Sequence, residues 1–147
     1  MLLSKTVTTE GLIFLKLFQK HFYVFAMGFE LNRGTGGDAK DPNTNQIIES
    51  KATSNWDRDT TSFSPSEDFD VLYFLRLNQR DDELYIYDTE INSDDLKSIQ
   101  VNKTQTLGDQ QAQGRRPRFS VIKFIIEAND IKPVAKVELR TKKIIKL

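Results

Sequence analysis

Residues 36–51 read GGDAKDPNTNQIIESK, and this stretch predicts a β-hairpin around which the rest of the chain is organised. The Asp-Pro-Asn at 41–43 is typical of a turn, because proline presets φ at the second turn position and the Asp and Asn side chains hydrogen-bond the nearby backbone. Two β-branched isoleucines at 47 and 48 then favour a strand. We therefore expect two short extended segments folded back on each other.

The hairpin would gather two acids and a lysine. Alternate side chains of a strand share a face, so Glu49 and Lys51 point one way and Ser50 the other. The turn brings Asp38 of the first segment alongside them. Two carboxylates and an ammonium in this arrangement suit a divalent cation and a polarised water. The same residues also fit a solvated hairpin with a cross-strand Asp–Lys pair, and the motif alone does not decide between the two.

Composition limits the chemistry that is available. The 147 residues predict a single domain over 1–147 with a core of its own. There are no cysteines and one histidine, His21, which excludes disulfides, thiol chemistry and multi-histidine metal sites. Any metal site would be built from carboxylates, and these select hard cations such as Mg²⁺ or Mn²⁺.

The net charge is zero but unevenly distributed. Residues 57–95 hold twelve acidic and three basic residues, whereas residues 114–147 hold ten basic and three acidic ones. A basic C-terminal third in a neutral protein favours one face made for a polyanion. The alternative is that the two blocks neutralise each other in the fold.

The N-terminal residues predict a largely buried helix. Thr8 or Thr9 is a plausible N-cap, and an apolar run follows to Met27, stopping at Gly28. Polar residues at 16 and 19–21 interrupt the run, so it is too short to cross a membrane, and no signal-peptide cleavage site follows. We expect a cytoplasmic protein.

The clearest strands lie in the middle of the chain. Residues 69–77 form a nearly continuous apolar run, as expected of a strand buried on both faces, and residues 84–87 return after a polar turn. Residues 94–99 predict a short helix. Apolar spacing predicts a helix over 119–126, and residues 134–145 predict a final edge strand protected by lysines.

Two polar segments predict contacts with nucleic acid. Residues 52–65 form a long loop after the Glu-Ser-Lys strand, and residues 101–118 lack hydrophobic periodicity but gather amides and cations. Amide, hydroxyl and guanidinium groups bind phosphates and base edges. The candidate DNA-binding residues are Thr53, Ser54, Asn55, Lys103, Gln105, Gln110, Gln113, Arg115, Arg116 and Arg118. The alternative for both segments is a solvated loop, with Trp56 packed beneath the first.

The acid pair and the order of elements resemble the PD-(D/E)XK nuclease superfamily. Asp38 stands as the first acid and Glu49-Ser50-Lys51 as the E-x-K element, with Gly37 where the family has proline. Residues 51–55, 69–77, 102–106 and 113–118 further resemble small type II restriction endonucleases that cut short, interrupted GC-rich palindromes. The resemblance implies an α/β fold with a restriction-endonuclease-like core, a mixed β-sheet flanked by helices.

The resemblance also implies a mechanism. Asp38 and Glu49 would hold Mg²⁺ (or Mn²⁺), with the Ser50 carbonyl as a third ligand, and Lys51 would orient or deprotonate the attacking water. The product ends would be 5′-phosphate and 3′-hydroxyl. A palindromic target implies a homodimer on double-stranded DNA in a prokaryotic cell. Enzymes of this kind often place a further glutamate on the first helix; here Glu10 or Glu30 would have to substitute, or no third acid is needed, or an altered N-terminus impairs activity.

Two alternatives of a different kind remain at this stage. One is a structure-specific or repair nuclease on the same scaffold. The other is a DNA-binding protein that keeps the scaffold without catalysis.

Overall fold

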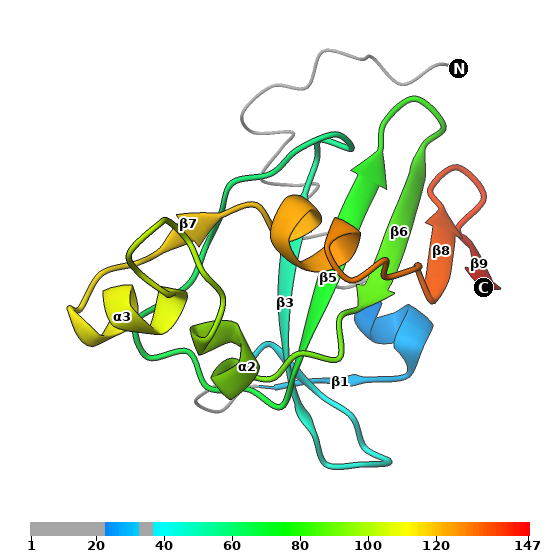
Figure 1. Ribbon diagram of the computed structural model, residues 1–147. Coiled ribbons are helices and arrows are strands. Elements are labelled where there is room, and N and C mark those ends of the chain that lie inside the picture. The colour runs from blue at the N-terminus through cyan, green and yellow to red at the C-terminus, as the bar shows by residue number, and fades with distance from the viewer. Residues whose placement is uncertain (1–22, 33–36) are drawn as a thin grey trace.

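The computed structural model describes residues 23–32 and 37–147, and its main feature is a curled seven-stranded sheet (Figure 1). In spatial order its strands are β1 (Glu30–Leu31), β2 (Ala39–Lys40), β3 (Ile47–Thr53), β5 (Val71–Asn78), β6 (Glu83–Asp88), β8 (Ala135–Glu138) and β9 (Lys143–Lys146). Neighbouring strands are antiparallel except β3 and β5, which are parallel. The sheet is therefore mixed, and the predicted α/β class is confirmed.

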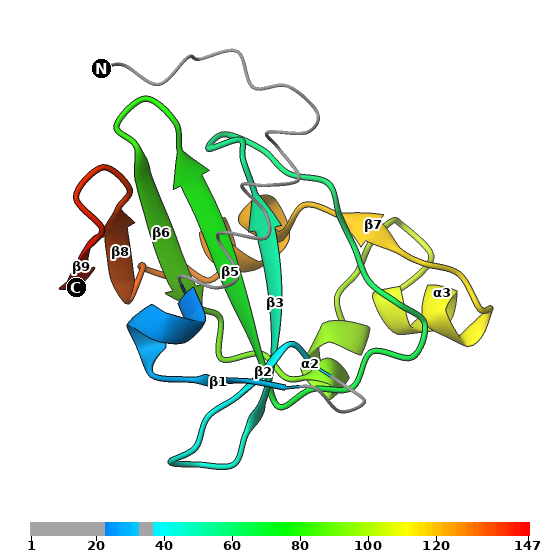
Figure 2. The ribbon, with the colours of Figure 1, turned by 180° about the vertical axis from the view of Figure 1, so that it is seen from behind.

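The helices cover both faces of this sheet. A short helix at 23–27 lies behind it (Figure 2), whereas α2 (Ser93–Lys97), α3 (Leu107–Ala112) and the π-helix η1 (Ile122–Glu127) lie in front (Figure 1). The predicted N-terminal helix falls largely outside the described residues, but 23–27 are helical and end at Gly28, whose φ is 71°. Within the ranges 23–32 and 37–147, no helix is long and apolar enough to cross a bilayer.

Strand β5 divides the interior into two hydrophobic cores. Because side chains alternate along a strand, Val71, Tyr73, Leu75 and Leu77 face the rear core with the helix at 23–27, and Leu72 and Phe74 face the front core with η1, α2 and α3. This strand is buried on both faces, which is why it appears in the sequence as a continuous apolar run. The prediction that residues 69–77 form a central strand paired with 84–87 is confirmed.

The predicted hairpin is also confirmed. Strands β2 and β3 are antiparallel, with Ala39 opposite Ile48. The turn between them is held by Asp41, whose side chain accepts from the Asn43 N–H at 2.9 Å and whose carbonyl accepts from the Asn45 N–H at 2.8 Å. The Asp and Asn chemistry that predicted the turn is the chemistry that closes it.

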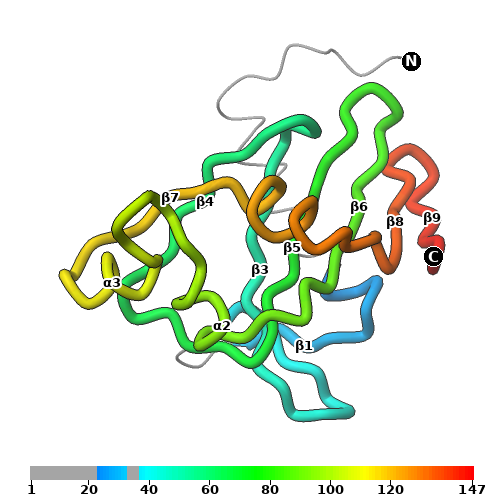
Figure 3. The backbone as a smooth tube through the Cα atoms, viewed as in Figure 1, coloured from blue at the N-terminus to red at the C-terminus, as the bar shows by residue number. Residues whose placement is uncertain are grey.

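The chain between β3 and β5 forms a second, smaller sheet on the front. Strand β4 (Thr61–Ser62) pairs antiparallel with β7 (Arg118–Phe119), and the two run side by side in Figure 3. Asp59 fixes this unit to η1, because its carboxylate accepts from the Val121 N–H at 2.8 Å and the Ile122 N–H at 3.0 Å. A carboxylate at the start of a helix satisfies backbone donors that have no partner within the helix.

Three predictions about the C-terminal half need correction. Residues 134–145 are a hairpin of β8 and β9, not one strand; the turn is made by non-glycine residues, with Lys142 at φ 59°, so glycine and proline gave no signal. The predicted helix at 119–126 exists as η1, but Phe119 belongs to β7. Residues 101–118 are not irregular throughout, because they contain α3.

Candidate active site

Asp38 lies at the open edge of β3. Its backbone N–H donates to the Ile48 carbonyl at 2.7 Å, and its Oδ2 accepts from the Ser50 N–H at 2.9 Å and from the Ser50 hydroxyl at 2.8 Å. β2 is only two residues long, so the side chain of Asp38 takes the place of the next backbone partner of β3. The hairpin thus fixes one carboxylate against the edge of the strand that carries the other.

Gly37 permits this approach. Its φ is 71°, and a Cβ there would collide with the side chain of Ile47 and come within 2.9 Å of the Ile48 carbonyl oxygen. A residue without a Cβ is required both by the backbone angle and by the space. A proline at position 37, as in the PD-(D/E)XK pattern, would not supply this conformation.

Glu49 and Lys51 project from the same face of β3, as predicted. The Lys51 Nζ lies 3.8 Å from the Glu49 Oε1, and the Glu49 side chain also lies within hydrogen-bonding reach of Asp38. Burial, together with the nearby carboxylates of Asp38 and Glu67, raises the pKa of Glu49 to about 8, although Lys51 opposes the shift. Two carboxyl groups so close share a proton readily, since both cannot be ionised without a compensating charge.

This pair fits a hard divalent cation. A cation would replace the shared proton and relieve the repulsion between the Asp38 and Glu49 carboxylates. The described part of the chain holds no cluster of three or more Asp, Glu, His or Cys side chains arranged for a metal. Mg²⁺ does not need one, because it is commonly held by one or two carboxylates together with waters and substrate phosphates.

The third acid at the site is Glu67, which sequence reasoning missed. Its Oε1 lies 3.2 Å from the Lys51 Nζ, and its side chain is 9% exposed. Of the two predicted substitutes, Glu30 is exposed in β1, opposite Lys40, and Glu10 lies outside the described residues. Glu67 follows Ser64-Pro65-Ser66 in a loop. The sequence periodicity of strands and helices therefore could not predict where its side chain lies.

A pocket of about 240 Å³ opens over β3 beside these groups. Its lining comes from Glu49, Ser50, Lys51 and Ala52 on the strand and from Thr60, Thr61 and Ser62 opposite. At roughly 30 Å³ per water in the liquid, it has room for a phosphate group and several waters. The hydroxyl-bearing wall continues into β4, where Ser62 pairs with Arg118 of β7.

The three predicted DNA-binding residues lie at the end of β3 and in the loop that follows it, and they support that loop. Thr53 is buried, and its hydroxyl accepts from the Asn55 N–H at 3.1 Å. The Ser54 carbonyl accepts from Gln79, and the Asn55 side chain accepts from the Asp57 N–H at 2.9 Å. Trp56 stacks beneath the Arg76 guanidinium at 4.0 Å, which anchors the loop on the sheet. The DNA-binding roles of 53–55 stay predictions.

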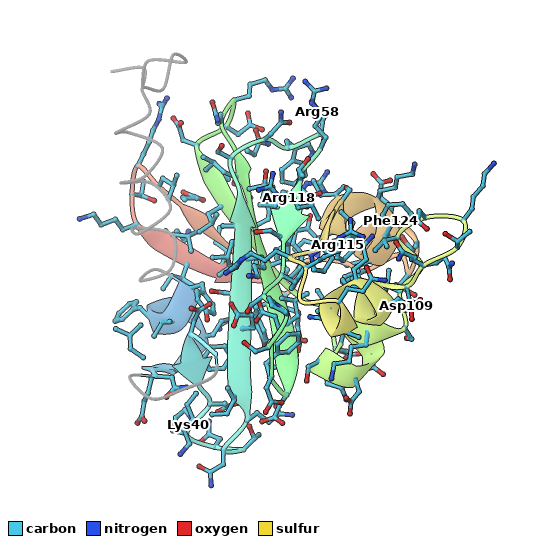
Figure 4. The ribbon with its side chains drawn as sticks, turned by 90° about the vertical axis from the view of Figure 1, so that its left-hand side faces the viewer. Lys40, Arg58, Asp109, Arg115, Arg118 and Phe124 are labelled. Carbon is cyan, nitrogen blue, oxygen red and sulfur yellow. The ribbon has the colours of Figure 1, made fainter. Side chains whose placement is uncertain are left out.

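The predicted residues of 101–118 divide into two groups. Gln110 is buried in α3 and donates to the side chain of Gln105 at 3.3 Å, so these amides hold each other. Lys103, Gln113, Arg115, Arg116 and Arg118 are exposed. Figure 4 shows Arg115, Arg118 and Arg58 on the face of the molecule along which β3 runs. Arg58 was not among the predicted DNA-binding residues, although it lies in the polar loop at 52–65.

Comparison with known proteins decides the family. Residues 5–128 match the family model described as Bsp6I restriction endonuclease. The chain is also 80% identical, over 145 residues, to the type II restriction enzyme Bsp6I of Bacillus sp. (strain RFL6), which is 99% of this chain and 83% of that enzyme. The chain belongs to the Bsp6I restriction endonuclease family. No solved structure matches it.

Membership of the Bsp6I family confirms the prediction that the chain is a restriction endonuclease. The finer assignments, to the PD-(D/E)XK superfamily and to enzymes of short, interrupted GC-rich palindromes, stay predictions. So do the metal, the end chemistry, the site residues, the dimer and the cytoplasmic location.

Proposed function

We propose that the chain is a Mg²⁺-dependent type II restriction endonuclease of the PD-(D/E)XK kind, with its active site on β3. The observation that carries the proposal is that Glu49 and Lys51 line one pocket, while Asp38 is hydrogen-bonded to Ser50 between them, in a member of the Bsp6I family. The proposed reaction is hydrolysis of a DNA phosphodiester to 5′-phosphate and 3′-hydroxyl ends. The proposed target is a short, interrupted GC-rich palindrome, cut by a homodimer with one subunit on each strand.

Each residue has a role that follows from its position. Asp38, Glu49 and the Ser50 carbonyl would hold the cation, and Mn²⁺ would serve in place of Mg²⁺. When bound, the metal supplies Lewis-acid polarisation of the phosphoryl oxygen and acidifies water. Lys51 lines the pocket, so its ammonium would orient the attacking water and offset the charge that develops on the phosphate.

DNA binding would involve the exposed cations beside the pocket. The guanidinium groups of Arg115, Arg116 and Arg118 reach solvent on the segment that adjoins β4, and Lys103 is exposed on the preceding turn. Bidentate arginine–guanine contacts are worth about 1–3 kcal/mol of discrimination, and they suit a GC-rich target. Phosphate contacts by the same side chains would set the register of the duplex.

The test is incubation of phage DNA with the protein and Mg²⁺. Discrete bands are expected, and Asp38→Ala, Glu49→Ala and Lys51→Ala should abolish them while leaving much of the DNA affinity in Ca²⁺. A smear would favour a non-specific or structure-specific nuclease on the same scaffold. DNA bound but left intact by the unaltered protein would favour a binding protein without catalysis.

A further inference from the structure

Lys51 has a carboxylate partner outside the proposed metal pair, and that partner is the nearer one. The Lys51 Nζ lies 3.2 Å from the Glu67 Oε1 and 3.8 Å from the Glu49 Oε1. The Lys51 side chain is 21% exposed and that of Glu67 is 9% exposed. An ion pair this far removed from water is screened weakly, and loss of one partner leaves the other charge uncompensated.

Glu67 is itself fixed in place. The same Oε1 accepts from the Ser64 N–H at 2.8 Å, and the Glu67 N–H donates back to the Ser64 carbonyl at 3.3 Å. The turn at 64–67 therefore closes on itself around the carboxylate. On its other side, the Lys51 ammonium lies 4.9 Å from the centre of the Phe63 ring. A long lysine side chain with four rotatable bonds is thus held from two directions by one short loop.

The loop is tied in turn to the segment proposed to contact DNA. The Gln111 side chain of α3 is buried and donates to the Ser64 carbonyl at 2.8 Å, and the Phe63 N–H donates to the Pro117 carbonyl at 3.0 Å. Residues 111–117 and the partner of Lys51 therefore belong to one hydrogen-bonded unit.

We propose that Glu67 is a positioning residue for catalysis, which holds the Lys51 ammonium at the pocket while Glu49 is engaged with the metal. A cation held by Glu49 would leave that carboxylate with less negative charge to offer Lys51. Glu67 then provides the electrostatic attraction that holds the Lys51 ammonium in place. Without it, a phosphate oxygen of the DNA would attract the ammonium away from its position at the pocket. This inference rests on the proposed function, because it assigns Glu67 a part in that reaction.

The decisive variant is Glu67→Gln. It retains an oxygen for the Ser64 N–H and removes only the charge that faces Lys51. We expect the single-turnover rate of cleavage to fall about 10- to 100-fold. This is the usual effect of losing a residue that orients a functional side chain without itself contacting the substrate. The dissociation constant for a cognate duplex in Ca²⁺ should stay within about twofold of the unaltered value. Glu67→Asp keeps the charge at a shorter reach and should cleave at an intermediate rate.

Asp68→Asn is the matched control. Asp68 is exposed, carries the same charge at the next position, and contacts Ser93 of α2 at 3.5 Å, away from Lys51. Its rate should stay within about twofold of the unaltered enzyme.

Cleavage by Glu67→Gln at the unaltered rate would overturn the inference. A parallel loss of rate and DNA affinity would also overturn it, because it would show that the loop is only a structural support. If Glu67→Gln does not fold, Glu67→Asp decides: a slower rate at unchanged affinity supports the role, and an unchanged rate removes it. Failure of the unaltered protein to cleave any DNA would instead reject the proposed function.

Discussion

The carboxyl pair at the edge of β3 makes the stability of the metal-free protein depend on pH through Glu49. Burial and the carboxylates of Asp38 and Glu67 raise the pKa of Glu49 from 4.5 to about 8. A raised pKa means that the folded protein binds the proton more tightly than the unfolded chain does. The stabilisation is therefore complete below about pH 4.5 and is lost as the pH rises through about 8.

The size of the effect follows from the shift. At 1.36 kcal/mol per pKa unit, a shift of this size corresponds to a change on the order of 5 kcal/mol in the free energy of unfolding. Because the Asp38 carboxylate contributes to the shift, the change depends on both residues. Glu49→Gln removes the ionisable group but keeps its shape, and its stability should lack this component of the pH dependence.

The assay is urea unfolding in EDTA at several pH values from 5 to 8.5, at constant ionic strength. The stability of the unaltered protein minus that of Glu49→Gln should fall steadily as the pH rises. Mg²⁺ should flatten the fall, because it replaces the proton between the two carboxylates. A difference that stays constant across this range, without metal, would refute the argument that these carboxyl groups share a proton.

Three further predictions concern residues that position the site and its DNA face. Gly37→Ala should lower the free energy of unfolding by more than the roughly 1–2 kcal/mol of left-handed strain, measured by urea unfolding, because its Cβ would also meet the carbonyl of Ile48. Gly28→Ala, at the same φ with open space around it, should cost the strain alone. Asp59→Ala should destabilise the protein by about 2–3 kcal/mol and slow cleavage, since the N–H groups at the start of η1 lose their acceptor and the pocket wall is released; unchanged melting would contradict this. Arg118→Ala should reduce the slope of log K for DNA against log salt by about 1 if Arg118 contacts a phosphate, whereas an unchanged slope with relaxed sequence preference would indicate a base contact.

The central part of the fold could be predicted because its signals are local. The turn at 41–43 carries its own hydrogen-bonding groups, and β5 is apolar at every position that the two cores bury. The Glu-Ser-Lys triplet then follows from the two-residue period of a strand. Each of these inferences needed only residues within a few positions of one another.

The parts of the fold and of the site that could not be predicted depend mostly on contacts between distant segments. Glu67 meets Lys51 only because the long connection from β3 to β5 folds back over the strand. Helix α3 did leave a local signal, since Thr106 and Asp109 form a capping box, but the polar composition around it drew the interpretation toward an irregular loop. The turn between β8 and β9 used Lys142 at a positive φ, where the sequence offers no glycine to mark it.

The sheet is buried on both faces, and this separates residues that the enzyme must conserve from residues that it can change. Ala39 and Ile48, which flank the first acid, rest on the rear core, whereas Phe63 and Leu107, beneath the amide- and arginine-rich segment, rest on the front one. Substitutions in the front surface can therefore accumulate without disturbing the packing behind Asp38, whereas those near Phe63 would reach Glu49 and Lys51, which share the front face. We expect relatives with altered target preference to differ mainly in the front surface away from Glu49, Lys51 and Glu67, and to keep the rear core.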